Sequence, residues 1–193
     1  MTKGAAEVAS LFGGAADPPG NAGESVYPGY PGYVMAQGRV RQMAWGFPLA
    51  MKGKNGQPLK PKPVNNARTD KLDSGFWRPS FQARRCLIPV SEFAEAEGER
   101  GAKTRTWFSL PDRELFAVAG IWRDTPEWGP TYSMIMTDAC PHVADVHDRM
   151  PVILQRESWA DWLDGSTDAA RLLCQPYAAD MTVRRTADPW VQR

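Results

Sequence analysis

The sequence predicts an α+β fold: one domain, residues 1–193, with a strongly curved, mainly antiparallel, barrel-like sheet flanked by short helices. Segments of strand character outnumber helical ones and mostly follow one another directly, which is typical of antiparallel sheets. The 17 Gly and 17 Pro imply many turns, and the 8 Trp supply aromatic anchors between short strands. A chain of 193 residues is long enough for one hydrophobic core and short for two domains, and no linker interrupts it.

The first elements are a helix and an extended segment. Residues 2–12 predict a short amphipathic helix, because Val8, Leu11 and Phe12 fall on one face and Thr2 can serve as its N-cap. The glycine pair that follows residue 12 ends the helix. Residues 15–32 are rich in Pro and Gly, so they are expected to be extended surface chain.

The next segments alternate between strand and loop character. Residues 33–47 predict two strands joined at Gln37-Gly38. Residues 48–65 contain Lys, Pro and Gly with almost no large apolar groups, so we expect a polar loop insertion. Residues 85–95 predict one buried strand, entered from an Arg pair.

A hairpin and a further strand are expected in the middle of the chain. Residues 97–105 are charged and predict an exposed turn. Residues 106–110 and 115–122 predict a hairpin around the Pro-Asp-Arg turn between them, and residues 131–137 predict another strand.

Two helices are expected near the C-terminal end. Residues 155–164 have aromatic and aliphatic side chains at helical spacing, and Gly165 follows them. A second helix begins after a Ser166/Thr167 cap and ends before Pro176.

Charge and cysteine content exclude several classes of protein. The 23 basic and 22 acidic side chains give a net charge of +1, so any anion-binding surface must be local. No apolar run approaches the length of a membrane-spanning helix, and the N-terminal segment does not have the pattern of a signal peptide. The 3 Cys show no C-x-x-C spacing, which favours a reducing compartment. We therefore expect a cytoplasmic protein without a membrane partner.

The sequence has 2 histidines, so candidates for a general acid or base are few. His147 precedes Asp148 and Arg149, which could orient the imidazole and hold an anion. The alternative is a structural histidine, which is the more common role for a single His.

Polar and aromatic residues elsewhere suggest nucleic-acid contacts. Asn66 and Arg68 offer hydrogen-bond donors suited to phosphate, and Arg85 adds positive charge. Trp45 and Gly46 together could place an aromatic face and a bare backbone against a base. Each of these residues has a structural alternative: a solvated surface group, or a core Trp with a turn glycine.

Glu95 is a candidate proton-transfer group, because a carboxylate that emerges from a buried strand can have a raised pKa. An ordinary surface Glu is the alternative, and Glu92 and Glu97 lie nearby. Cys140, His142 and His147 lack the spacing and the fourth ligand of a zinc site, so we expect neither metal nor cofactor. A Cys140–His147 peptidase dyad is possible, although an inert buried thiol is favoured.

Taken in order along the chain, these pieces resemble the SRAP family (SOS-response-associated peptidase). The resemblance runs from the first helix to about residue 183. It rests on Trp45-Gly46, Asn66-Ala67-Arg68, Arg85-Cys86-Leu87-Ile88-Pro89 with Glu95, the segment Phe116 to Trp122, Thr137, and His147-Asp148-Arg149-Met150-Pro151-Val152-Ile153-Leu154.

The resemblance implies the SRAP fold and a protein of the SOS and DNA damage response that binds single-stranded DNA and captures abasic sites. Family members carry a cysteine directly after the initiator Met, and autoproteolytic removal of that Met, the peptidase or hydrolase activity, frees an α-amine beside a thiol. The amine forms a Schiff base with the opened sugar, in lyase-like chemistry, and the thiol closes a stable thiazolidine. Because this ring closure is intramolecular, the pair captures an aldehyde better than either group alone.

The resemblance also implies roles for individual residues. Asn66, Glu95 and His147 would be catalytic: Asn66 holds the terminal cysteine, Glu95 acts as acid and base near the α-amine, and His147 helps to open the sugar ring. The DNA-binding residues would be Trp45, Gly46, Arg68, Arg85, Thr137 and Arg149. We expect a monomer that associates with the nucleoid when it is bound to DNA.

The sequence departs from the family at its start, where position 2 is Thr rather than Cys. Our hypothesis is that a Met-Cys-Asn-Leu-Tyr-type segment lies upstream of Met1, and that the chain as given binds abasic DNA without forming a stable crosslink. A single-stranded DNA-binding module without chemistry, and a Cys140–His147 peptidase, remain as alternatives. The insertion with Lys52, Lys54, Lys60 and Lys62 is either an extension of the DNA track or a flexible loop.

Overall fold

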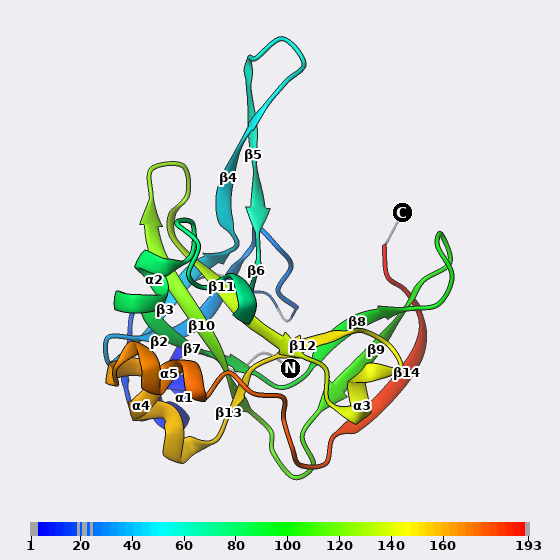
Figure 1. Ribbon diagram of the computed structural model, residues 1–193. Helices are drawn as coiled ribbons and strands as arrows, with labels where there is room; N and C mark the ends of the chain where they lie inside the picture. Colours follow the sequence, from blue (N-terminus) through cyan, green and yellow to red (C-terminus); the bar gives the residue numbers. More distant parts are fainter. Residues whose placement is uncertain (1–3, 19, 21–22, 24, 192–193) are drawn as a thin grey trace.

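The computed structural model describes residues 4–18, 20, 23 and 25–191. Five of its strands close into a barrel, in the order β3-β2-β7-β10-β11 and back to β3 (Figure 1). Their bounds are β2 Pro31–Ala36, β3 Arg39–Trp45, β7 Arg85–Val90, β10 Phe116–Thr125 and β11 Gly129–Asp138. Neighbouring strands are antiparallel except at the closing pair, where β3 and β11 run parallel. The expected α+β class with a barrel-like, mainly antiparallel sheet is therefore confirmed.

Both faces of the barrel wall are buried, because its strands alternate between two apolar clusters. One cluster draws side chains from all five barrel strands and fills the interior, with Val34, Met43, Cys86, Val118 and Tyr132 among its members. The alternate side chains face outward and pack against the helices. This two-sided burial explains why β7 and most of β10 are nearly continuous apolar runs, whereas β3 contains Arg39, Arg41 and Gln42 and is only partly buried.

Short helices cover one side of the barrel (Figure 1). They are α1 Ala5–Phe12, α2 Arg78–Ala83, α4 Trp159–Asp164 and α5 Thr167–Leu172, with α3 Pro141–Ala144 elsewhere and two 3-10 helices, Thr69–Lys71 and Arg156–Ser158. Gly13 ends α1 in the left-handed conformation at φ 76°, as expected. Helix α1 starts at Ala5, and the expected cap Thr2 lies outside the described residues.

The helices near the C-terminal end confirm their predicted start and stop signals. Ser166 caps α5 by accepting a hydrogen bond of 3.1 Å from the backbone N–H of Ala169. Gly165 follows the last residue of α4. The second helix ends at Leu172, which is earlier than the expected limit before Pro176.

The remaining strands lie at the edges of the barrel or in two smaller sheets. Their bounds are β1 Ala15–Ala16, β4 Phe47–Lys52, β5 Pro58–Val64, β6 Asn66–Arg68, β8 Phe93–Glu97, β9 Thr104–Ser109, β12 Arg149–Pro151, β13 Ile153–Leu154 and β14 Thr182–Pro189. Strands β14, β9 and β8 form a three-stranded sheet, and β4 pairs with β5.

Three predictions about this part of the chain were wrong. Residues 48–65 are a β-hairpin rather than a loop; its strands hardly alternate between buried and exposed, so they lack the usual pattern. The expected strand 85–95 is two strands, β7 and β8, which belong to different sheets. Residues 106–110 pair with β8 and β14 rather than with β10, because the Pro-Asp-Arg turn leads from one sheet to the other.

The joined strands of residues 33–47 are confirmed as β2 and β3. Gln37 and Gly38 both have positive φ, 53° and 71°, which suits a two-residue hairpin turn. Strand β14 was not predicted, because its residues are mostly exposed and mostly polar. In the described part of the chain, no helix is long and apolar enough to cross a membrane.

Candidate functional site

Two short strands bring distant cations together at one end of β11. Met136 of β11 pairs with Arg68 of β6 and also with Pro151 of β12. Since a strand residue has one partner on each side, β6 and β12 flank β11 on opposite sides. Two residues further along the β11–β12 ladder, Asp138 pairs with Arg149. The sheet register therefore places Arg68 and Arg149 near the same strand end, although they are far apart in sequence.

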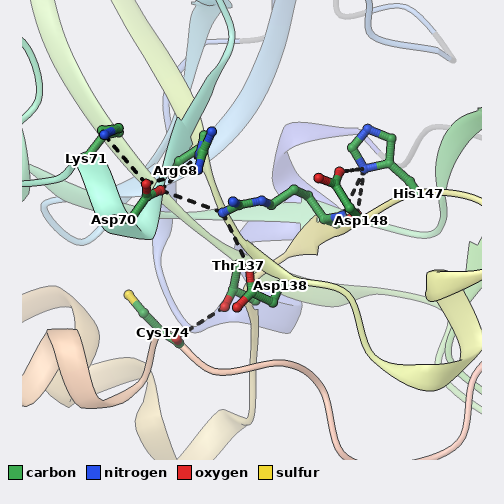
Figure 2. Close-up of polar contacts among 9 residues, drawn as sticks. Arg68, Asp70, Lys71, Thr137, Asp138, His147, Asp148 and Cys174 are labelled. Carbon is green, nitrogen blue, oxygen red and sulfur yellow. Dashed lines mark hydrogen bonds and ion pairs between the residues drawn. The ribbon is translucent and has the colours of Figure 1, made fainter.

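A carboxylate links these two arginines (Figure 2). Arg68 donates two hydrogen bonds to Asp70, Nε to Oδ1 and Nη2 to Oδ2, each of 2.9 Å. Arg149 Nη1 lies 3.6 Å from Oδ1 of Asp70 and 3.6 Å from Oδ1 of Asp138, and Lys71 Nζ lies 3.7 Å from Oδ2 of Asp70. We call these five residues the cationic cluster; it holds three cations and two carboxylates.

The cluster's electrostatics keep Asp70 ionised. Partial desolvation raises the pKa of the Asp70 carboxyl, but the hydrogen bond from Arg68 and the charges of Arg68, Lys71 and Arg149 outweigh it. The net effect is a pKa below the usual value. An anion such as phosphate could take the place of this carboxylate on the same guanidinium groups.

His147 stands immediately before β12 and is tied to Arg149 through the backbone. The N–H of Arg149 donates to Nδ1 of His147 at 3.0 Å, and the carbonyl oxygen of Arg149 lies 3.1 Å from the same nitrogen. Oδ1 of Asp148 lies 3.3 Å from it. All these contacts are at Nδ1, so they orient the ring, and the His147 side chain is 40% exposed.

Glu95 lies in β8, where it pairs with Thr106, and not at the end of the preceding strand. Its side chain is half-buried. Burial raises the pKa of the Glu95 carboxyl; the charge of His147 opposes this, Asp148 adds to it, and Lys103 opposes it. The carboxyl therefore lies within electrostatic reach of His147. Asn66 is two residues before Arg68 on β6, and the alternation of the strand puts both on its exposed face, with Ala67 buried between them.

The structure places two expected DNA-binding residues in the interior. Arg85 is 7% exposed, and its guanidinium donates to the carbonyl oxygens of Phe81, Gln82, Trp162 and Gly165. It therefore stabilises the packing of α2 and α4 on the barrel and does not form part of an exposed basic surface.

Thr137 is 4% exposed and its hydroxyl donates to the carbonyl oxygen of Cys174 at 3.4 Å, which supports the strand under the cluster (Figure 2). For Thr137, as for Arg85, burial contradicts direct contact with DNA. Arg85 was suggested by its charge and Thr137 by the family resemblance alone; the partners that bury both side chains are backbone oxygens from distant segments, which the sequence does not reveal.

Trp45 and Gly46 lie at the parallel seam of the barrel. The half-buried indole of Trp45 donates to the carbonyl oxygen of Asn65 at 3.0 Å and stacks near Tyr132, with ring centroids 6.4 Å apart. Gly46 has φ 117°, and a Cβ at this position would lie 2.6 Å from Cβ of Pro63. A turn glycine packed on Pro63 thus accounts for Gly46, while the Trp45 ring is anchored beside Asn66.

The cluster includes three residues that the sequence interpretation missed: Asp70, Lys71 and Asp138. Asp70 lies two residues after Arg68, and this spacing was the available signal that the two side chains could pair. The contact with Arg149 depends on the pairing of β6 and β12 with β11, which no local pattern encodes.

The cysteines do not provide an accessible thiol. Cys86, Cys140 and Cys174 are all buried, and burial raises the pKa of Cys174 to about 11. The Cys140 thiol contacts Sδ of Met181 at 3.8 Å, in the apolar interior, so the Cys140–His147 dyad is not supported. Within the described residues, no group of His, Cys, Asp and Glu side chains could hold a metal ion.

The chain is similar in sequence to several known proteins. The sequence matches the family model described as SOS response associated peptidase (SRAP) over residues 3–191. It is similar to the abasic site processing protein YoqW of Bacillus subtilis, with 33% identity over 156 residues, 74% of this chain and 66% of that protein. It is also similar to the abasic site processing protein HMCES of Gallus gallus, with 26% identity over 167 residues, 71% of this chain and 49% of that protein. The matched region thus spans just under two thirds of YoqW and about half of this HMCES.

Solved structures share the fold. A protein from Bordetella bronchiseptica superposes with a TM-score of 0.79 at 21% identity, covering 96% of this chain and 97% of that one. A protein from Bacteroides thetaiotaomicron gives a TM-score of 0.75 at 22% identity, covering 96% and 89% of the two chains.

Proposed function

Because this chain belongs to the SRAP family, the SOS response associated peptidases, we propose that it processes abasic sites in single-stranded DNA. The relatives named as abasic site processing proteins support this assignment. The observation that carries it is the joining of Arg68 and Arg149 through Asp70, directly beside His147 and within electrostatic reach of Glu95. The candidate phosphate ligands and the candidate proton-transfer groups thus belong to one site in this proposal.

The cationic cluster binds the DNA backbone in this proposal. Arg68 and Arg149 present forked donors to the phosphates beside the lesion. These phosphates take the place of the Asp70 and Asp138 carboxylates on the two guanidinium groups. Asn66, on the same exposed face as Arg68, adds an amide donor and acceptor. The indole of Trp45 lies at the edge of this track and stacks against a base.

Glu95 and His147 perform the proton transfers. An abasic deoxyribose is mostly a closed ring, and it opens when the C1′ hydroxyl loses a proton while the ring oxygen gains one. His147 suits this step because its ring is fixed at Nδ1, which leaves Nε2 for the sugar. When an amine attacks the aldehyde, the N–C bond forms and one proton passes from the nitrogen to the carbonyl oxygen. The C–O bond then breaks as Glu95, with its raised pKa, protonates the hydroxyl, which leaves as water, and the second proton of the nitrogen returns to the Glu95 carboxylate.

On the chain as given, binding occurs without a stable crosslink. A thiazolidine needs a thiol next to an α-amine, and all three cysteines are buried. Denaturing electrophoresis with single-stranded DNA that carries a natural abasic site tests this point. A heat-stable shifted band from the 193-residue chain would refute it.

A version extended before Met1 by a Met-Cys-Asn-Leu-Tyr segment tests the roles of the site. We expect this version to lose its first Met, visible by intact mass, and to form the heat-stable band. Glu95→Gln and His147→Gln should each slow band formation by about 10²-fold or more while DNA affinity is retained. Glu99→Gln and His142→Gln are the matched controls. Equal rates for site and control variants would overturn the assignment.

A binding module without chemistry is the second candidate function, favoured by the burial of every cysteine. It predicts equal affinity for abasic and intact single strands. A preference for the abasic strand in fluorescence anisotropy supports abasic-site processing instead.

A further inference from the structure

Two arginines lie side by side near the start of β11, where α2 packs against β10 (Figure 1). Arg84 is the C-cap residue of α2, and its carbonyl oxygen accepts a hydrogen bond of 2.8 Å from the backbone N–H of Trp122. Arg123 is the next residue of β10 and pairs with Thr131 of β11. The cationic cluster lies at the other end of β11, around Asp138. Roughly 23 Å of strand therefore separates the cluster from this arginine pair.

The guanidinium of Arg123 is held by two aromatic rings and one carbonyl oxygen. Its Cζ lies 4.0 Å from the ring centroid of Phe47 and 4.5 Å from that of Phe76. Its Nη1 donates to the carbonyl oxygen of Phe76 at 3.3 Å. Aromatic faces attract the charge of a guanidinium but do not accept hydrogen bonds from the N–H groups along its edge. The rings therefore fix the position of Arg123 and leave most of its donors unused.

One N–H donor of each arginine lacks an acceptor. Nε of Arg84 and Nε of Arg123 are both buried, and neither has a hydrogen-bond partner among the described residues. The neighbouring Arg85 differs, because its guanidinium donates to four carbonyl oxygens. A buried donor on a charged group is costly to leave unpaired, and in native proteins such a group commonly belongs to a site for a water molecule or an ion.

The charge of the arginine pair is also uncompensated at close range. Within the described part of the chain, no ion pair joins Arg84 or Arg123 to a carboxylate. Burial and the charge of Arg84 lower the pKa of the Arg123 guanidinium, and the charge of Glu127, in the turn between β10 and β11, opposes this. Two partly desolvated like charges repel each other, and an anion between them would relieve the repulsion.

We propose that Arg84 and Arg123 form a second anion site, which binds a phosphate group between the two guanidinium groups. Both side chains are half-buried, so an anion can reach them from solvent. A phosphate has enough oxygen atoms to accept from the forks of two arginines at once, whereas one carboxylate is matched to one fork. The phosphate belongs either to a free phosphate ion or to a phosphomonoester. This inference does not depend on the proposed function, because the pair is remote from the cationic cluster.

The Nε–H signals of arginine side chains in ¹H–¹⁵N spectra of the full chain report on the proposed donors directly. Sodium phosphate is titrated at pH 6.5, and sodium chloride keeps the ionic strength constant. Arg84→Lys and Arg123→Lys assign the two signals, since each removes one Nε–H. We expect both signals to shift with one dissociation constant, on the order of 1 mM. Sodium acetate should bind at least about tenfold more weakly, because it cannot serve both forks.

Methyl phosphate, titrated in the same way, distinguishes the two sources of the phosphate group. Tighter binding of methyl phosphate than of inorganic phosphate would identify the ligand as a phosphomonoester. Tighter binding of inorganic phosphate would identify it as the free ion. Either result supports the site.

Three variants separate this site from other sources of a shift. Arg84→Gln should abolish the response of the Arg123 Nε–H to phosphate. Arg78→Gln, at an exposed position of α2, and Arg149→Gln, in the cationic cluster, should leave the responses of Arg84 and Arg123 unchanged.

The proposal fails if phosphate at constant ionic strength moves neither signal, or if acetate moves both as strongly. It also fails if Arg123 responds to phosphate equally in Arg84→Gln, or if Arg149→Gln removes the responses. The titration of the unchanged protein decides the outcome even if Arg84→Gln does not fold, because the two donors are observed there directly.

Discussion

The backbone N–H of Arg149 donates a hydrogen bond to Nδ1 of His147, with 3.0 Å between the two nitrogens. A neutral imidazole that accepts at Nδ1 carries its proton on Nε2. Arg149, our proposed phosphate ligand, therefore favours the Nε2–H tautomer of the neighbouring histidine through its main-chain N–H, against the Arg149 carbonyl oxygen and the Asp148 carboxylate, which lie 3.1 and 3.3 Å from the same nitrogen. Nε2 is then left to exchange a proton with a ligand.

The first prediction concerns this tautomer. Long-range ¹H–¹⁵N correlation spectra, recorded where the chemical shifts show a neutral ring, should identify His147 as the Nε2–H form. His142 is the internal comparison, because its Nε2 lies 3.7 Å from Oδ1 of Asp180. An Nδ1–H form of His147 would mean that the ring donates to the Arg149 carbonyl oxygen, and the assigned role of Nε2 would fail.

The second prediction concerns Arg149 as a phosphate ligand. Its side chain is 19% exposed and held between Asp70 and Asp138, so it presents a positioned donor. Arg149→Gln should lower affinity for abasic single-stranded DNA roughly tenfold or more, the value of a charged hydrogen bond. The slope of log affinity against log salt concentration should become less steep by about 0.7, which is the contribution of one phosphate contact on a single strand. Anisotropy titrations over a range of salt measure both, and the exposed Arg113→Gln should change neither.

The third prediction concerns Asp70 as a competitor of the phosphate. Asp70→Asn removes the carboxylate shared by Arg68, Lys71 and Arg149, so DNA should bind several-fold more tightly at pH 7. The low pKa of Asp70 keeps this carboxyl charged until the pH falls below its usual range. The advantage of the variant should therefore shrink only at strongly acidic pH. Asp73→Asn, which breaks the pair with Arg171, is the matched control; an equal gain there would show a general charge effect.

Asp70 also shows which part of the site the sequence could not predict. Asn66, Arg68, Glu95, His147 and Arg149 were singled out from residue type and from the family resemblance. Their contacts depend on which strands pair with β11, and Asp70 gains its importance only through Arg149 from a distant strand. Chemistry carried by single residues is readable from sequence, whereas long-range pairing is not.

The same distinction between local and long-range features applies to the fold. The turn at Gln37-Gly38 and the cap at Ser166 depend on local conformation, and both were predicted. The β4–β5 hairpin was expected to be a loop. Its residues are mostly exposed, so its sequence lacks the apolar alternation of a half-buried strand.

The fourth prediction concerns Arg85, which the sequence suggested as a DNA ligand. Its guanidinium satisfies carbonyl oxygens of α2 and of the end of α4, including Trp162 and Gly165. Arg85→Met leaves these buried acceptors without a donor and should lower the free energy of unfolding by about 3 kcal/mol. Urea unfolding measures this loss of stability. The loss should be smaller in Arg85→Lys than in Arg85→Met. The folded fraction of either variant should keep the wild-type salt dependence of DNA binding. A less steep dependence of log affinity on log salt concentration would show that Arg85 contacts DNA after all.

The fifth prediction concerns the pH dependence of stability at Glu95. Burial raises the pKa of this carboxyl above its usual 4.5, so the folded state binds the proton more tightly than the unfolded state. Ionisation therefore destabilises the fold: the penalty is absent below about pH 4.5 and grows as the pH rises through the folded-state pKa. Glu95→Gln should leave the melting temperature nearly unchanged at pH 4 and raise it at pH 8.

The size of that rise at pH 8 is about 2–4 °C for each kcal/mol of penalty removed. Thermal unfolding across the pH range measures it, and Glu99→Gln at an exposed position should give a flat difference. A variant that is more stable at pH 8 and slower in the chemistry of the extended chain has lost a group kept for function at a cost in stability. A Glu95→Gln variant that is less stable at pH 8 than at pH 4, relative to wild type, would show that the charged carboxylate is the form the fold prefers, and the assignment of Glu95 as the proton donor would fall with it.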